Sequence, residues 1–220
     1  MSVIRLQLTL VFMGDSGVGK TSLRLRLEGQ PWDDIVKFIA GEMTQRGKKL
    51  TIYSSSIMRD YYINAVRYEI LWTIYDLAGQ DYAREVIESL LGQGRVAVAV
   101  FDVTRRITFE NLRDWWIPKY WEKIEEKRRS SKLYKSFHGR KAPLVLVGNK
   151  IDLRREDDPD HVKTEEISML AEQLSEKLGL EVPYIEISAK ESDFTYVEKI
   201  LELAANAYVK WLASIGEKEY

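Results

Sequence analysis

The feature that most constrains this fold is a glycine-rich segment, Gly14 to Thr21. Its glycines let the backbone curl so that successive N–H groups point inward, and a following helix would direct its positive N-terminal end at the same point. The Lys20 ammonium can reach the outer phosphates of a nucleotide, and the Thr21 hydroxyl can ligate the accompanying Mg²⁺. The segment therefore predicts a phosphate-binding loop with contacts from Gly14, Asp15, Ser16, Gly17, Val18, Gly19, Lys20, Thr21 and Ser22.

The flanks favour this interpretation over an ordinary glycine-rich turn. A phosphate loop of this kind needs a strand before it and a helix after it. The apolar residues 8–13 are typical of a strand, and residues 22–27 are rich in leucine and arginine, which favour a helix. Both requirements are met.

Composition excludes several classes of protein. The 220 residues can bury one substantial core, and we expect a single domain over 1–220. Because 33 basic residues nearly balance 34 acidic ones, we expect no nucleic-acid partner. The absence of cysteine excludes disulfides, thiolate metal sites and lipids attached through sulfur. Without a signal peptide or an apolar run of about 20 residues, we expect a cytoplasmic monomer.

Strand and helix patterns alternate along the chain. Apolar and polar residues alternate over 66–74, which predicts a strand with one buried face. Unbroken apolar runs at 96–101 and 144–147 are typical of central parallel strands. Further strands are expected at 8–13, 51–58 and 184–187, and helices at 109–127, 164–178 and 193–212. The order predicts an α/β fold with a mostly parallel six-stranded sheet and helices on both faces.

Polar motifs follow three of these strands, where ligands bind in parallel sheets. They are Asp76-Leu77-Ala78-Gly79-Gln80, Asn149-Lys150-Ile151-Asp152 and Ser188-Ala189-Lys190. Alone, the second could be a polar turn, and the third has little specificity. Together with the phosphate loop, the set resembles the guanine-nucleotide-binding motifs of the Ras superfamily, and the chain is most similar to small GTPases of the Ras and Rab kind. The resemblance extends from about residue 6 to residue 212 and implies the G-domain fold of P-loop NTPases.

The resemblance implies a guanine site. The Asp152 carboxylate would accept hydrogen bonds from both donors on the guanine edge, a pattern that adenine does not present. Asn149 would tie the loops together, and Lys150 would lie along the base plane. Within Ser188-Ala189-Lys190, the Ala189 N–H would reach the guanine carbonyl.

The resemblance also implies GTP hydrolysis with Mg²⁺. Asp76 and Thr21 would hold the metal, the Gly79 N–H would meet the γ-phosphate, and Gln80 would be the catalytic residue that positions water. Residues 81–91 would form the second switch. Nothing places Arg84 or Arg95 in the site, so we expect no arginine of this chain to act there and a slow intrinsic rate.

The first switch is less defined. The family uses a threonine before the second strand to close over Mg²⁺, and Thr51 matches it best by its neighbours. Thr44 is the alternative, because residues 41–49 look inserted relative to Ras and Rab proteins.

A second insertion, residues 127–141, is basic and contains no acidic residue. We favour a solvated extension of the preceding helix; the alternative is a patch for an acidic partner or an anionic membrane. Because the chain ends without the prenylated tail of the family, any membrane contact is expected to be peripheral and electrostatic.

These observations predict a molecular switch that cycles between GTP and GDP with Mg²⁺ and serves effector, exchange-factor and GTPase-activating proteins. The alternatives are a guanine-nucleotide-binding interaction module with little or no turnover, and a P-loop ATPase or kinase that would leave residues 149–152 unexplained.

Overall fold

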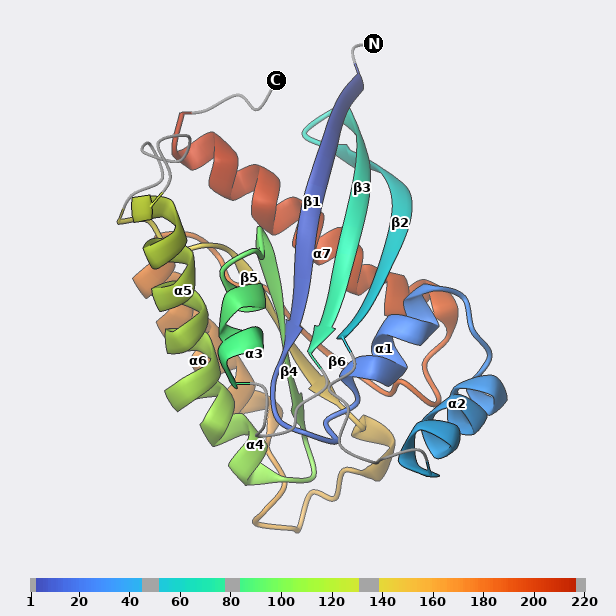
Figure 1. The fold of residues 1–220 in the computed structure, drawn as a ribbon. Helices are drawn as coiled ribbons and strands as arrows, with labels where there is room; N and C mark the ends of the chain where they lie inside the picture. The colour runs from blue at the N-terminus through green and yellow to red at the C-terminus, as the bar shows by residue number, and fades with distance from the viewer. Residues whose placement is uncertain (1–2, 45–51, 78–83, 131–138, 217–220) are drawn as a thin grey trace.

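A six-stranded sheet with the strand order β2-β3-β1-β4-β5-β6 runs through the centre of the molecule (Figure 1). The structure is a computed structural model, and it describes residues 3–44, 52–77, 84–130 and 139–216. The strands are β1 Val3–Met13, β2 Ile52–Ile63, β3 Val66–Leu77, β4 Val96–Asp102, β5 Leu144–Asn149 and β6 Tyr184–Ile187. The sheet has the number of strands that the sequence pattern predicts.

The strand pairing is parallel except at one edge. β1 pairs in parallel with β3 and β4, β4 with β5, and β5 with β6, whereas β2 runs antiparallel to β3. The turn between β2 and β3 has positive φ at Asn64 (50°) and Ala65 (60°), which suits the twist of a two-residue hairpin. The prediction of a mostly parallel sheet is confirmed.

Helices fill the connections between strands. They are α1 Lys20–Leu27, α2 Trp32–Thr44, α3 Arg84–Leu91, α4 Arg106–Asn111, α5 Ile117–Ser130, α6 Thr164–Leu178 and α7 Phe194–Ser214. The single helix predicted over 109–127 is wrong in detail, because a π-helical turn, Leu112–Trp116, separates α4 from α5. Pro118 has no N–H to donate to Asp114 in a regular α-helix, which favours such a local rearrangement.

Helices cover both faces of the sheet, as predicted. α1 and α7 pack on one face, and α3, α4, α5 and α6 pack on the other (Figure 1). β1 serves both cores because its side chains alternate: Leu10 and Phe12 face the first core, and Val11 and Met13 face the second. This arrangement fixes the ends of the central strands, which carry the candidate site.

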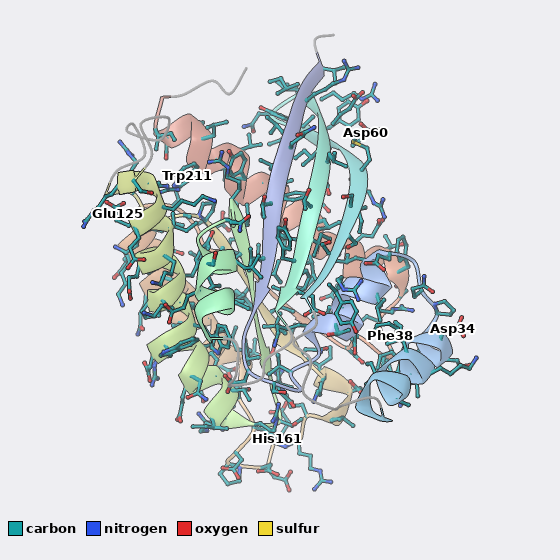
Figure 2. All side chains as sticks on the ribbon, in the orientation of Figure 1. Asp34, Phe38, Asp60, Glu125, His161 and Trp211 are labelled. Atoms are coloured by element: carbon teal, nitrogen blue, oxygen red, sulfur yellow. The ribbon has the colours of Figure 1, made fainter. Side chains whose placement is uncertain are left out.

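Aromatic residues hold both ends of the basic insertion. Figure 2 shows Trp211 of α7 near the end of α5, and the Arg128 guanidinium carbon lies 5.2 Å from the centre of its ring. The Lys141 ammonium lies 5.3 Å from the Trp121 ring. These cations pack on aromatic faces. Residues 127–130 continue α5, as a helix extension requires, but Arg128 is buried rather than solvated; residues 131–138 lie outside the described part.

The predicted insertion at residues 41–49 also lies only partly within the described residues. Residues 41–44 are the last residues of α2, and residues 45–51 lie outside the described part of the chain. Across the described ranges, no helix is both long and apolar enough to cross a membrane.

Trp72 of β3 provides a test of the core. Its side chain is fully buried, and Nε1 donates a hydrogen bond to the Tyr61 hydroxyl at 3.0 Å. Trp72→Ala should lower the free energy of unfolding by about 4 kcal/mol and the melting temperature by about 10 °C. Met58→Ala on neighbouring β2 is the control, because that side chain is 57% exposed. Similar losses for both variants, measured by circular dichroism, would contradict the assigned burial.

Candidate functional site

The loop between β1 and α1 curls tightly because three of its glycines have positive φ: 135° at Gly14, 75° at Gly17 and 100° at Gly19. A Cβ atom on Gly14 would lie 2.0 Å from the Val100 carbonyl oxygen, and one on Gly19 would lie 2.2 Å from Asn149 Nδ2. Both positions therefore require glycine for conformation and for space. The loop is a cradle packed directly against its neighbours.

Lys20 begins α1 and turns back over this cradle. Its ammonium is nearly buried and donates hydrogen bonds to the carbonyl oxygens of Gly14, at 2.7 Å, and Asp15, at 2.8 Å. Burial lowers the pKa of Lys20 to about 8, against the opposing effect of the Asp76 and Asp15 charges. An anionic ligand in the cradle would favour the protonated form and relieve this cost.

Thr21 and Asp76 form the candidate metal side of the cradle. Thr21 Oγ1 donates a hydrogen bond to Asp76 Oδ2 at 2.6 Å, and the Asp76 side chain is fully buried. Asp76 Oδ1 has no hydrogen-bond partner among the described residues. A buried carboxylate oxygen without a partner, beside a threonine hydroxyl, fits a hard cation.

The donor set also fits Mg²⁺ in particular. Within the described ranges, no three His, Cys, Asp or Glu side chains gather to hold a metal by themselves. Mg²⁺ is usually held by one or two protein groups together with phosphates and water. Thr21 and Asp76 are sufficient for that mode of binding.

Asn149 connects the phosphate loop to the loop after β6. Its buried amide donates from Nδ2 to the Val18 carbonyl at 2.8 Å and accepts at Oδ1 from the Ala189 N–H at 3.0 Å. The expected tie between the loops is therefore present. Because the Ala189 N–H is already donated to Asn149, contact with a guanine carbonyl would require sharing that proton.

The other residues expected at the base lie around the same strand ends. Lys150 follows β5 with a φ of 69°, and Asp152 is half-buried in a 3₁₀ turn, Ile151–Leu153. Ser188 Oγ accepts from the Glu191 N–H at 2.9 Å, which closes the turn after β6. The Lys190 side chain is exposed.

Asp15 braces the loop from outside. Its carboxylate accepts hydrogen bonds from Asn111 Nδ2, at 2.7 Å, and from Trp116 Nε1, at 2.8 Å. The side chain thus contacts the end of α4 and the π-helical turn, so any contact of Asp15 with phosphate would come from its backbone. Sequence reasoning missed both partners, because the π-helical turn that positions Trp116 was not expected.

Asp102 and Arg105 were also missed. The buried Asp102 carboxylate accepts from Lys150 Nζ at 2.7 Å and from Arg105 Nε at 2.9 Å, and Arg105 Nη2 donates to the Ser16 carbonyl at 3.1 Å. Burial tends to raise the pKa of Asp102, but hydrogen bonds from Lys150 and Thr104 outweigh it and lower the pKa. The strand-end rule could have found both residues, because Asp102 closes β4 at the same edge.

The described part of the chain does not include three residues that were also expected at this site, Gly79, Gln80 and Thr51. Thr44, the alternative to Thr51, is the last residue of α2.

The chain is similar in sequence to known proteins over most of its length. Residues 9–210 match the model of the Ras family. Ras-related protein RABC2b of Arabidopsis thaliana is 32% identical over 175 residues, which cover 77% of this chain and 68% of that protein. Ras-related protein RabJ of Dictyostelium discoideum is 30% identical, over 86% of this chain and 59% of that protein. Human Ras-related protein Rab-27B is 26% identical, over 95% of this chain and 83% of that protein.

Gly19 provides a test of the packed cradle. Gly19→Ala introduces an unfavourable φ and a clash with Asn149, and should lower the free energy of unfolding by about 3 kcal/mol in denaturant titrations. Gly29→Ala is the matched control, because Gly29 also has a positive φ (83°) but nothing lies within 4 Å of the added Cβ. Its expected cost is about 1 kcal/mol. Equal costs would show that Asn149 does not pack on the loop.

Proposed function

The chain belongs to the Ras family, and from this premise we propose that it is a molecular switch that binds GTP or GDP with Mg²⁺ and hydrolyses GTP to GDP and phosphate. The observation that carries the proposal is the bridging of Val18 and Ala189 by the Asn149 side chain. This bridge makes the phosphate-binding and base-binding loops one unit.

Each group has a role in binding. The loop N–H groups and the N-terminus of α1 cradle the phosphates, and Lys20 neutralises their charge. Thr21 and Asp76 would hold Mg²⁺, which would supply charge neutralisation for phosphoryl transfer. Asp152 would accept from the guanine edge, and Lys150, whose Nζ donates to Asp102 Oδ2 at 2.7 Å, would lie beside the base.

Beyond nucleotide and metal binding, hydrolysis requires only that the attacking water and the γ-phosphate be positioned. Gln80 would orient the attacking water, and the Gly79 N–H would contact the γ-phosphate. We infer a slow intrinsic rate, because an arginine supplied by a partner can contribute about 10³ to 10⁵ in rate. Arg105 contacts the loop from the Ser16 side, but it is tied to Asp102.

The switch role follows from the γ-phosphate contacts. Residues 81–91 and the segment that contains Thr44 and Thr51 would be ordered by GTP and released by hydrolysis. Effector, exchange-factor and GTPase-activating proteins would read these surfaces on a single domain. We place the protein in the cytoplasm, with any membrane contact peripheral.

Base specificity is tested at Asp152. Asp152→Asn should weaken GDP binding about 100-fold, because an amide cannot accept from both guanine donors. Xanthosine diphosphate, whose carbonyl replaces the exocyclic amino group, should bind Asp152→Asn more tightly than the wild type, because the amide can donate to that carbonyl. Asp157→Asn, at an exposed position five residues on, is the matched control and should bind as the wild type does. Adenine nucleotide in the pool released from the purified protein would favour the ATPase alternative.

Hydrolysis is tested at Gln80. Gln80→Leu should slow single-turnover GTP hydrolysis about tenfold or more, because a hydrogen bond to the reacting water is lost from the transition state. Gln93→Leu is the control, since Gln93 is exposed beyond α3. Nucleotide binding should be retained in both. Equal rates in the wild type and Gln80→Leu would overturn the catalytic role of Gln80, and little or no hydrolysis by the wild type would favour the interaction module.

A further inference from the structure

Arg24 is a buried cation that the proposed chemistry does not use. It lies on α1, and its side chain is only 5% exposed. Residues three apart on a helix share a face, so Arg24 lies on the same face of α1 as Thr21. A buried arginine carries a large desolvation cost unless anionic or aromatic groups compensate for it.

Three groups surround the guanidinium. Arg24 Nη1 donates to Glu28 Oε1 at 2.5 Å, and Nε lies 3.6 Å from Asp76 Oδ2. The guanidinium carbon lies 5.2 Å from the centre of the Tyr53 ring. Tyr53 in turn makes an edge contact, 5.5 Å between ring centres, with Phe38 of α2, which Figure 2 labels. Arg24 is thus enclosed between acidic groups and an aromatic face.

Arg24 and Thr21 approach the same carboxylate oxygen. Asp76 Oδ2 accepts from Thr21 Oγ1 at 2.6 Å and faces Arg24 Nε at 3.6 Å. Within the described residues, neither Arg24 Nε nor Asp76 Oδ1 has a hydrogen-bond partner. The ion pair is therefore incomplete on both sides, and each partner can still interact with a further group.

The charge of Arg24 affects how strongly a metal ion binds beside Asp76. Water and salt screen buried charges poorly, so a cation held by Thr21 and Asp76 is repelled by the nearby guanidinium. Arg24 also offsets part of the Asp76 charge that would attract the metal. Glu28 compensates Arg24 only partly, because its own side chain is 22% exposed.

We propose that Arg24 acts as a built-in counter-cation at Asp76 that weakens Mg²⁺ binding and so raises the Mg²⁺ concentration that nucleotide retention requires. The inference rests on the proposed function, because it assigns the metal to Thr21 and Asp76. Arg24 is a positioning residue here, since it acts on the metal through Asp76.

The test measures release of a fluorescent GDP analogue from the full chain at a series of free Mg²⁺ concentrations. The quantity compared is the Mg²⁺ concentration that gives half of the total slowing of release. Arg24→Leu removes the charge but keeps an apolar contact with Tyr53, and should lower this concentration about tenfold or more. Arg24→Lys keeps the charge and should stay within about threefold of the wild type.

Two further variants separate charge from folding. Arg26→Leu removes an arginine of the same helix that donates to the Ser192 carbonyl instead, and should leave the Mg²⁺ concentration unchanged. Arg24→Gln is polar and uncharged, and should reproduce the effect of Arg24→Leu even if the leucine lowers the melting temperature.

The outcomes distinguish this inference from the proposed function. A wild type that responds to Mg²⁺, with Arg24→Leu and Arg24→Gln unchanged or requiring more Mg²⁺, overturns the role of Arg24 alone. A wild type whose GDP release does not respond to Mg²⁺ overturns both.

Discussion

The Asn149 side chain makes the contact on which the rest of the site depends. Its amide joins the phosphate loop at Val18 to the loop after β6 at Ala189, so one residue at the end of β5 sets the spacing between two loops. Gly19 packs so closely on the same amide that a side chain there would collide with it. The cradle is therefore rigid because its neighbours enclose it, and a rigid cradle pays little ordering entropy when it binds phosphate.

Around this contact, two buried carboxylates at the strand ends are each paired with cations. Asp102 accepts hydrogen bonds from Lys150 and Arg105, and Asp76 faces Arg24. Removing one member of such a pair leaves the other desolvated, which is the costly outcome for buried ions. The pairs therefore connect elements that a ligand would otherwise have to order. Lys20 is the exception: its hydrogen-bond partners are carbonyl oxygens, and burial lowers its pKa to about 8.

Local pattern was sufficient for much of the fold. Period-two alternation and short apolar runs predicted the strands, although β1 and β2 extend beyond their predicted ranges, because edge and half-buried segments carry weaker signals. The predicted 109–127 helix failed at the π-helical turn. That turn is stabilised where Trp116 reaches Asp15, a residue 101 positions away in the chain, so no window around it could reveal the contact.

The sequence by itself determined the fold class and the family, because strand and helix patterns and the order of the motifs can be read directly from the chain. Only the tertiary structure decided which charges meet. Arg24 is an ordinary basic residue in the sequence, and Lys150 is recognised there only as part of a motif. Helix packing brings Asp76 near Arg24, and sheet register brings Asp102 near Lys150. Electrostatic energy depends on distance through space and on exclusion of water, and neither quantity is written in the order of residues.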